Sequence, residues 1–255
     1  MNICIIGAGN MGGAIALGAA KRFPNYKINV TNRSGKNTER FTQFPNISCY
    51  VNNKRATKGA DVIILAVKPW VIKDVINEIS DVITADQALV SVAGGISLSE
   101  LEGMLPWTCP LFRVIPNIAA SVGESMTFIS ERNAGKKVMS DIVGIFSALG
   151  KVSVIEERLL PAATALCSCG IAYAFRYIRA SVEGAIELGI SPCDALDYIT
   201  QTLVGAAAVI NHDKIHPEEA IDRVTTPGGI TIKGLNAMEA NGFTNAVIAG
   251  LKASK

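Results

Sequence analysis

The chain has 255 residues, of which 49% are hydrophobic and 18% are charged, and its formal net charge is +2. This composition is typical of a globular protein with a large core, and it excludes a disordered chain. The nearly balanced charge provides no positive field for nucleic acid or for an anionic membrane surface, so we expect a small-molecule partner.

Cysteine and histidine usage argues against metal sites and disulfides. The six cysteines include no C-x-x-C pair, and His212 and His216 are the only histidines. We therefore expect no metal ligands and no disulfide framework. The first six residues run into glycine without a basic region, a stretch too short for a secretory or membrane segment. The expected compartment is the reducing cytoplasm.

A short apolar run near the start leads into a glycine-rich turn and then into a helical repeat. Gly7, Gly9 and Gly12 form the pattern G-x-G-x-x-G, and Asn10 and Met11 lie within it. The first glycine permits a tight turn, the second lets the backbone approach a pyrophosphate, and the third lets the helix pack closely on the strand. Because a strand precedes the turn and a helix follows it, the motif predicts a dinucleotide site rather than helix–strand packing alone.

The second predicted strand, at residues 27–31, ends in Asn32, Arg33 and Ser34, and Lys36 follows closely. An NAD enzyme would place a carboxylate here, which would repel a 2′-phosphate. A guanidinium beside a hydroxyl instead favours that phosphate, so we expect NADP(H), with NAD(H) as the alternative. The competing interpretation treats these cations as ordinary solvated loop charges.

Further apolar runs predict five strands, at residues 61–67, 88–92, 112–115, 125–130 and 151–155. Turn signals follow the first three runs, and Lys68 lies in the first of these turns. In an open α/β sheet the ligand lies at the carboxyl ends of the strands, so these turns should surround the nicotinamide half of the cofactor.

From residue 159 onward the strand signals vanish and long helical patterns follow. Small residues dominate the first of these helices between residues 162 and 174, which lets helices approach backbone to backbone. More apolar surface is available than a small helical domain can bury, so we expect a homodimer or a higher assembly of dimers. The predicted domains are residues 1–157 and residues 158–255.

A turn near the end of the chain exposes several backbone N–H groups immediately before another helical stretch. Pro227 fixes its own φ, Gly228 and Gly229 lack a Cβ, and the dipole of the following helix favours an anion. Thr226 and Thr231 add hydroxyl groups. The turn is therefore a candidate receptor for a small carboxylate, and an ordinary helix N-terminus is the alternative.

The glycine motif and the late turn occur together with four further motifs over nearly the whole chain: Asn32-Arg33, Ala66 to Pro69, Arg113 to Asn117 and Gln201 to Ala207. In this order they resemble pyrroline-5-carboxylate reductase. The resemblance implies a Rossmann-like α/β domain followed by an all-helical dimerisation domain with an intertwined dimer. It also implies reduction of 1-pyrroline-5-carboxylate to L-proline with NAD(P)H, the final step of proline biosynthesis.

The resemblance also assigns site residues. The cofactor-binding residues are Gly7, Gly9, Asn10, Met11, Gly12, Asn32, Arg33, Ser34, Asn53, Ala66 and Lys68. The substrate-binding residues are Thr226, Gly228, Gly229 and Thr231. We expect Thr231 to be the catalytic residue, because its hydroxyl can orient the ring nitrogen of a bound imine.

Several positions depart from the family pattern. The family's Ser-Gly-Ser-Gly-Pro-Ala-Tyr motif is replaced here by residues 167–173, which read Cys-Ser-Cys-Gly-Ile-Ala-Tyr. Ile118-Ala119 replaces Thr-Pro, Arg179 stands where glutamate is frequent, and Thr226 replaces serine. Losing the proline and the Thr-Pro pair should reshape the pocket wall and affect the choice of substrate.

Three alternative functions are weighed against this one. The first is reduction of another cyclic imino acid, and the second is non-catalytic NADP binding. The third is a 3-hydroxyacid dehydrogenase, which needs a helical lysine as its base. The sequence contains no lysine between Lys151 and Lys214, and an arginine is a poor substitute because it stays protonated.

Overall fold

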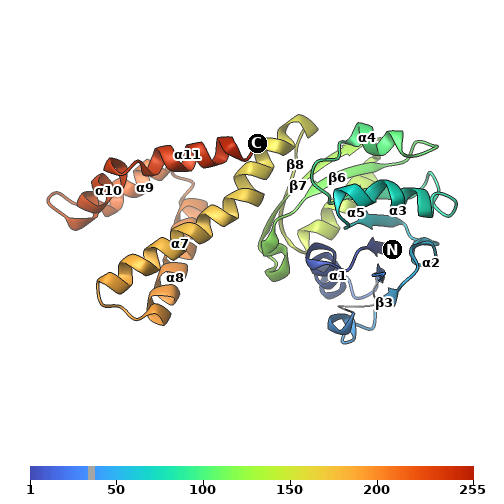
Figure 1. The fold of residues 1–255 in the computed structure, drawn as a ribbon, viewed down its shortest axis with the longest axis horizontal. Coiled ribbons are helices and arrows are strands. Elements are labelled where there is room, and N and C mark those ends of the chain that lie inside the picture. The colour runs from blue at the N-terminus through green and yellow to red at the C-terminus, as the bar shows by residue number, and fades with distance from the viewer. Residues whose placement is uncertain (34–37) are drawn as a thin grey trace. The chain divides into compact units, whose positions relative to one another are not determined.

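The computed structural model describes residues 1–33 and 38–255. Two units divide the chain, Met1–Ser168 and Cys169–Lys255. The first unit contains every strand found among the described residues, and the second is entirely helical (Figure 1). The chain thus has the α/β class and the order of parts that the sequence predicts.

A mostly parallel sheet of eight strands lies at the centre of the first unit, in the order β3-β2-β1-β4-β5-β6-β7-β8. The strands are β1 (Asn2–Ile6), β2 (Lys27–Thr31), β3 (Ile47–Tyr50), β4 (Val62–Leu65), β5 (Ala88–Ser91), β6 (Leu111–Ile115), β7 (Ser125–Arg132) and β8 (Gly150–Val154). Only the pair β6–β7 is antiparallel. The strand order reverses between β1 and β4, and ligands bind at such a switch point in open sheets.

Helices cover both faces of this sheet. They are α1 (Asn10–Arg22), α2 (Asn53–Thr57), α3 (Ile72–Ile79), α4 (Leu98–Gly103), α5 (Lys136–Ser147) and α6 (Leu160–Ala163). Successive side chains of a strand point to opposite faces, and β1 shows the result. Ile3 and Ile5 pack into the core that contains residues of α1 and α5, whereas Cys4 and Ile6 pack into the core that contains residues of α3 and α4.

The second unit consists of five helices: α7 (Gly170–Glu187), α8 (Pro192–Asp213), α9 (Pro217–Val224), α10 (Ile230–Ala240) and α11 (Phe243–Ala253). Tyr173 of α7 donates a hydrogen bond to the carbonyl oxygen of Gly250 in α11 at 3.1 Å. Asp213, at the end of α8, pairs with His212 and with Arg223 of α9, and both contacts hold the pKa of its carboxyl below the usual range. These contacts join neighbouring helices at their ends.

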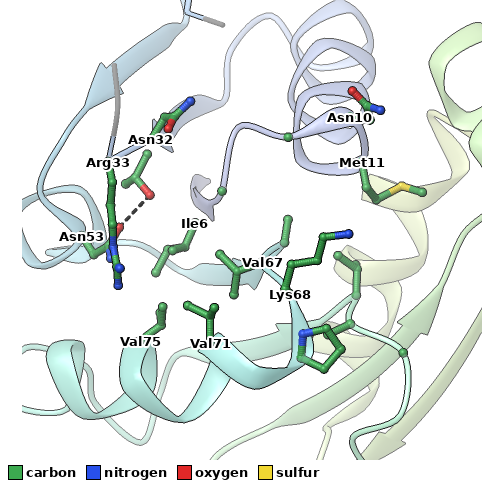
Figure 2. Close-up of a pocket in the computed structure, with 18 residues that line it drawn as sticks. Ile6, Asn10, Met11, Asn32, Arg33, Asn53, Val67, Lys68, Val71 and Val75 are labelled. Carbon is green, nitrogen blue, oxygen red and sulfur yellow. Dashed lines mark hydrogen bonds between the residues drawn. The ribbon is translucent and has the colours of Figure 1, made fainter. Parts of the chain in front are cut away.

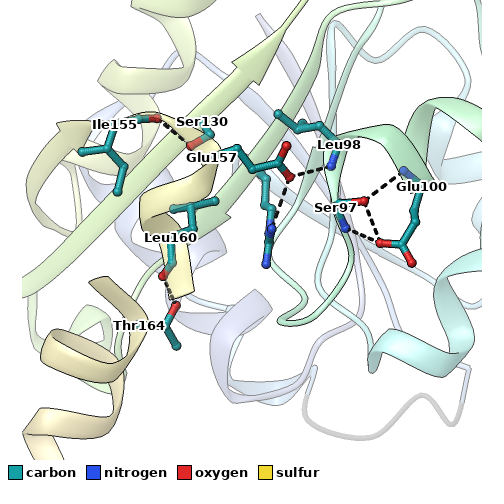
Figure 3. A network of polar contacts seen from close by, with 9 residues as sticks. Ser97, Leu98, Glu100, Ser130, Ile155, Glu157, Leu160 and Thr164 are labelled. Carbon is teal, nitrogen blue, oxygen red and sulfur yellow. Dashed lines mark hydrogen bonds and ion pairs between the residues drawn. The ribbon is translucent and has the colours of Figure 1, made fainter. Parts of the chain in front are cut away.

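The segment that follows β8 is fixed to the sheet by a polar network (Figure 3). Glu157 Oε1 accepts hydrogen bonds from Arg113 Nη1 at 3.2 Å and from the backbone N–H of Leu98 at 2.7 Å. The Ser130 hydroxyl donates to the carbonyl oxygen of Ile155 at 2.6 Å, and Leu160 is fully buried. This attachment places residues 157–168 with the first unit, while the predicted domain boundary between residues 157 and 158 stays a prediction.

We predict that Glu157→Ala lowers the free energy of unfolding by on the order of 2 kcal/mol, because it leaves a half-buried guanidinium and a backbone N–H without their shared acceptor. Urea denaturation measures the effect. Glu156→Ala is the matched control. Its pair with Arg158 is exposed on both sides and should contribute at most about 1 kcal/mol. Equal losses for the two variants would contradict the structural role of Glu157.

Candidate active site

The predicted glycine turn connects β1 to α1 at the switch point of the sheet. Gly7 has a φ of +110°, and a Cβ there would meet the carbonyl group of Ala66. A Cβ at Gly12 would overlap the carbonyl oxygen of Gly7. Gly9 is the N-cap of α1 and no atom lies near its missing Cβ, so the backbone is open on that side. The first N–H groups of α1 are thus available to an anion.

A pocket of about 740 Å³ opens beside this turn (Figure 2). Its lining includes most of the residues predicted to bind the cofactor: Gly7, Gly9, Asn10, Met11, Asn32, Arg33, Asn53, Ala66 and Lys68. Gly12 is not part of the lining and lies against Gly7 and Ala66 instead. Ser34 and Lys36 lie outside the described residues. The structure therefore gathers these residues from four separate segments into one pocket.

The charges around this pocket are positive. Arg33 and Lys68 are exposed and stand at opposite sides of the lining drawn in Figure 2. No acidic side chain occurs among the described residues that line the pocket. Apolar side chains such as Ile6, Val71 and Val75 complete the wall. The pocket can therefore hold a ligand with phosphate groups and an apolar portion.

Asn53 is a buried residue at the start of α2 that joins three elements. Its Oδ1 accepts a hydrogen bond from the hydroxyl of Thr31 at 2.7 Å, and its Nδ2 donates to Glu78 Oε2 at 2.9 Å. The amide is consequently held in one orientation between β2 and α3. Neither partner could be predicted from a local pattern, because both lie more than 20 residues away along the chain.

A second, smaller cavity of about 310 Å³ lies next to the first turn of α1. Its lining includes Asn117, Ile118 and Ser168, so two of the segments that depart from the family pattern form parts of one wall. Asn117 Nδ2 donates to the carbonyl oxygen of Cys167 at 3.3 Å, and Ser168 Oγ donates to that of Pro116 at 3.3 Å. Residues Thr164–Cys169 are π-helical, a form common at functional sites.

The Cys167 thiol, next to this cavity, is not activated. Burial raises the pKa of the Cys167 thiol above its ordinary value, so this group is protonated at neutral pH. Burial likewise raises the pKa of Cys4 in β1 to about 11. Neither side chain is suited to nucleophilic catalysis.

The late turn lies in the second unit, between α9 and α10. Gly228 has a φ of +74°, the N–H of Gly229 donates to the carbonyl oxygen of Thr226 at 2.9 Å, and Gly229 is the N-cap of α10. Thr226, Gly228 and Thr231 are exposed. The predicted substrate residues thus share one turn at the head of a helix whose N-cap has no side chain to satisfy its first N–H groups.

Known protein families match both parts of the chain. Residues 157–255 match the family described as pyrroline-5-carboxylate reductase dimerisation, and residues 2–95 match that described as NADP oxidoreductase coenzyme F420-dependent. Pyrroline-5-carboxylate reductase 2 of Dictyostelium discoideum is 33% identical, with 98% of this chain and 89% of that protein covered. The chain belongs to the pyrroline-5-carboxylate reductase family.

Other family members are similar to this chain over nearly its whole length. The reductase of Methanosarcina acetivorans is 34% identical, with 99% of this chain and 96% of that protein covered. Pyrroline-5-carboxylate reductase 1 of Dictyostelium discoideum is also 34% identical over 99% of this chain, which spans only 48% of that longer protein.

Solved structures of the family share the fold. A Plasmodium falciparum pyrroline carboxylate reductase with NADP bound has a TM-score of 0.90 and 26% identity, with 100% of this chain and 95% of that chain covered. The reductase of Coxiella burnetii has a TM-score of 0.91 and 29% identity, with 99% and 95% covered.

Proposed function

We propose that this chain reduces the C=N bond of 1-pyrroline-5-carboxylate to L-proline with NADPH, the final step of proline biosynthesis, in the cytoplasm. The main support is the similarity to reductases of this name over nearly the whole chain, at 33–34% identity. The pocket at the switch point adds a physical reason, since it combines a glycine-rich turn with cations and an apolar wall.

NADP(H) fits the pocket in the first unit. Gly9 has no side chain and no neighbouring atom where its Cβ would be, so a pyrophosphate can reach the N–H groups at the start of α1. In this proposal Arg33 holds the 2′-phosphate, Asn53 contacts the adenosine, and Ala66 and Lys68 lie beside the ribose and nicotinamide groups. When bound, the reduced cofactor supplies the hydride.

The late turn holds the substrate in this proposal. Its backbone N–H groups bind the carboxylate, and the Thr231 hydroxyl orients the ring nitrogen. The reaction adds a hydride to the imine carbon and requires a proton on nitrogen. A cyclic imine is basic enough to arrive protonated, so no strong general acid is needed. Catalysis then rests on orientation and on removing water from the reacting groups.

We propose further that the chain works as a homodimer or as an assembly of dimers. In residues 169–255, all of which the structure describes, Val182 and Ala195 are the only buried hydrophobic residues. Large apolar side chains such as Leu188, Val204 and Ile230 are more than 60% exposed. A helical unit cannot be stable with so small a core, so a second copy is needed to cover these surfaces. The match to a dimerisation family supports this assembly.

The same apolar character explains a feature of the helical segment Glu157–Glu187. By length and composition alone it could span a membrane, since an 18-residue window within it has a mean hydropathy of 1.3. Its second half nevertheless carries an exposed pair between Arg179 and Glu183. The dimer proposal accounts for the apolar residues without a bilayer.

Mixing the purified protein with NADPH and 1-pyrroline-5-carboxylate tests the reaction. We expect the absorbance of the reduced cofactor to fall while proline forms in equal amount. Tight NADPH binding with a flat trace would instead indicate a non-catalytic binding protein. Faster turnover of a six-membered cyclic imino acid would indicate a different substrate for the same site.

Removing the hydroxyl in Thr231→Ala should lower kcat/KM for the imine by roughly one to three powers of ten, the usual range for a positioned polar group. The melting temperature should not change, because the residue is exposed. Thr231→Ser keeps the hydroxyl and should retain most of the activity. Normal turnover by the alanine variant would show that Thr231 does not have this role.

Arg33→Ala should raise the KM for NADPH by roughly ten- to a hundred-fold, because a charged hydrogen bond to the 2′-phosphate contributes about 1.5–3 kcal/mol. NADH lacks this phosphate and serves as the internal control, with a KM that should change by less than about two-fold. Steady-state kinetics with both cofactors measures the difference. Equal losses would refute the assignment of Arg33.

A further inference from the structure

Arg40 contacts the glycine turn from a distant segment. It belongs to the short 3-10 helix Glu39–Phe41, which lies between β2 and β3. Its Nη2 donates hydrogen bonds to the carbonyl oxygen of Ala8 at 2.6 Å and to that of Gly9 at 2.8 Å. One guanidinium nitrogen therefore joins two successive peptide units of the turn between β1 and α1.

The surroundings of Arg40 leave space for this contact. A Cβ at Gly13 in α1 would overlap the guanidinium, so the guanidinium fits there only because Gly13 has no side chain. The buried ring of Phe41 lies beneath the cation, with 5.0 Å from Cζ to the ring centroid. Arg40 Nε is buried with no hydrogen-bond partner among residues 1–33 and 38–255, which costs folding free energy.

The contact fixes the direction of backbone donors. A carbonyl and the N–H of the next residue belong to one planar peptide unit, so holding the carbonyls of Ala8 and Gly9 also orients the N–H groups of Gly9 and Asn10. The carbonyl of Gly9 additionally accepts the N–H of Gly13 at 2.9 Å, in the first turn of α1. A cationic donor polarises these peptide units and strengthens the N–H groups as donors toward an anion.

We propose that Arg40 is a positioning residue that preorganises the glycine turn for the pyrophosphate of NADP(H). The proposal rests on the proposed function, in which this turn binds the cofactor. Arg40 and Arg33 then have separate roles. Arg33 acts on the 2′-phosphate, which only NADPH carries, whereas Arg40 acts behind the pyrophosphate, which NADPH and NADH share.

The test compares cofactor binding by calorimetric titration in the wild type and in Arg40→Met. We expect the Kd to rise about ten-fold for NADPH and equally for NADH, since a hydrogen bond to a charged group is lost. The kcat at saturating cofactor and the KM for 1-pyrroline-5-carboxylate should stay within about two-fold, because Arg40 acts in this proposal on the binding of the pyrophosphate and not on the imine. Arg40→Lys should restore most of the affinity. Arg22→Met, at the exposed end of α1, is the matched control and should bind normally.

Gly13→Ala gives an independent test, because it displaces the guanidinium without changing Arg40. Its Kd should rise as in Arg40→Met, while its melting temperature should not fall, since alanine favours a helix more than glycine does. The double variant should bind no more weakly than either single variant. Additive losses, or normal binding by Arg40→Met, would overturn the positioning role. Failure of the wild type to bind either cofactor would instead overturn the proposed function.

Discussion

The close approach of the turn after β1 to the end of β4 determines how the strands and α1 of the first unit pack at the pocket. A side chain at Gly7 or Gly12 would meet the neighbouring backbone, so the turn, α1 and β4 can pack in this way only with glycine at both positions. Since β1 lies between β2 and β4, the position of the turn also determines where α1 begins and where the pocket opens. The first N–H groups of α1 consequently lie at the edge of the pocket beside side chains such as Ile6 and Val71.

Features encoded by short sequence patterns could be predicted, and features that depend on distant residues could not. The glycine turn and the buried strands follow from short patterns, namely glycine spacing and apolar runs. β3 was missed because its four residues are half-buried or exposed and form no such run. Arg40 was missed for a different reason, since its contact with Ala8 spans 32 residues and no local pattern encodes it. The same holds for the partners of Asn53, although the residue itself was predicted from the family motif.

The two units differ in how many hydrophobic side chains they bury. The first unit buries isoleucines on both faces of its sheet and has two separate cores. The second unit buries almost no hydrophobic side chain, although the sequence predicted long helical patterns there. Helical periodicity reports which residues are apolar, but not whether their partner lies in the same chain. In the proposed dimer, a second copy supplies the missing core.

The two predicted anion sites both present the backbone N–H groups of a helix N-terminus, but different contacts hold their turns. Gly9 and Gly229 are both N-caps in extended conformation, with φ and ψ of −72° and −167° at the first and −67° and 166° at the second. Arg40 donates hydrogen bonds to the turn at Gly9, so the N–H groups of this turn are oriented before a ligand binds. The turn at Gly229 is exposed and is held by the positive φ of Gly228 and the bond to Thr226. Because a cation behind a turn strengthens its donors, this difference favours a doubly charged pyrophosphate at α1 and a single carboxylate at α10.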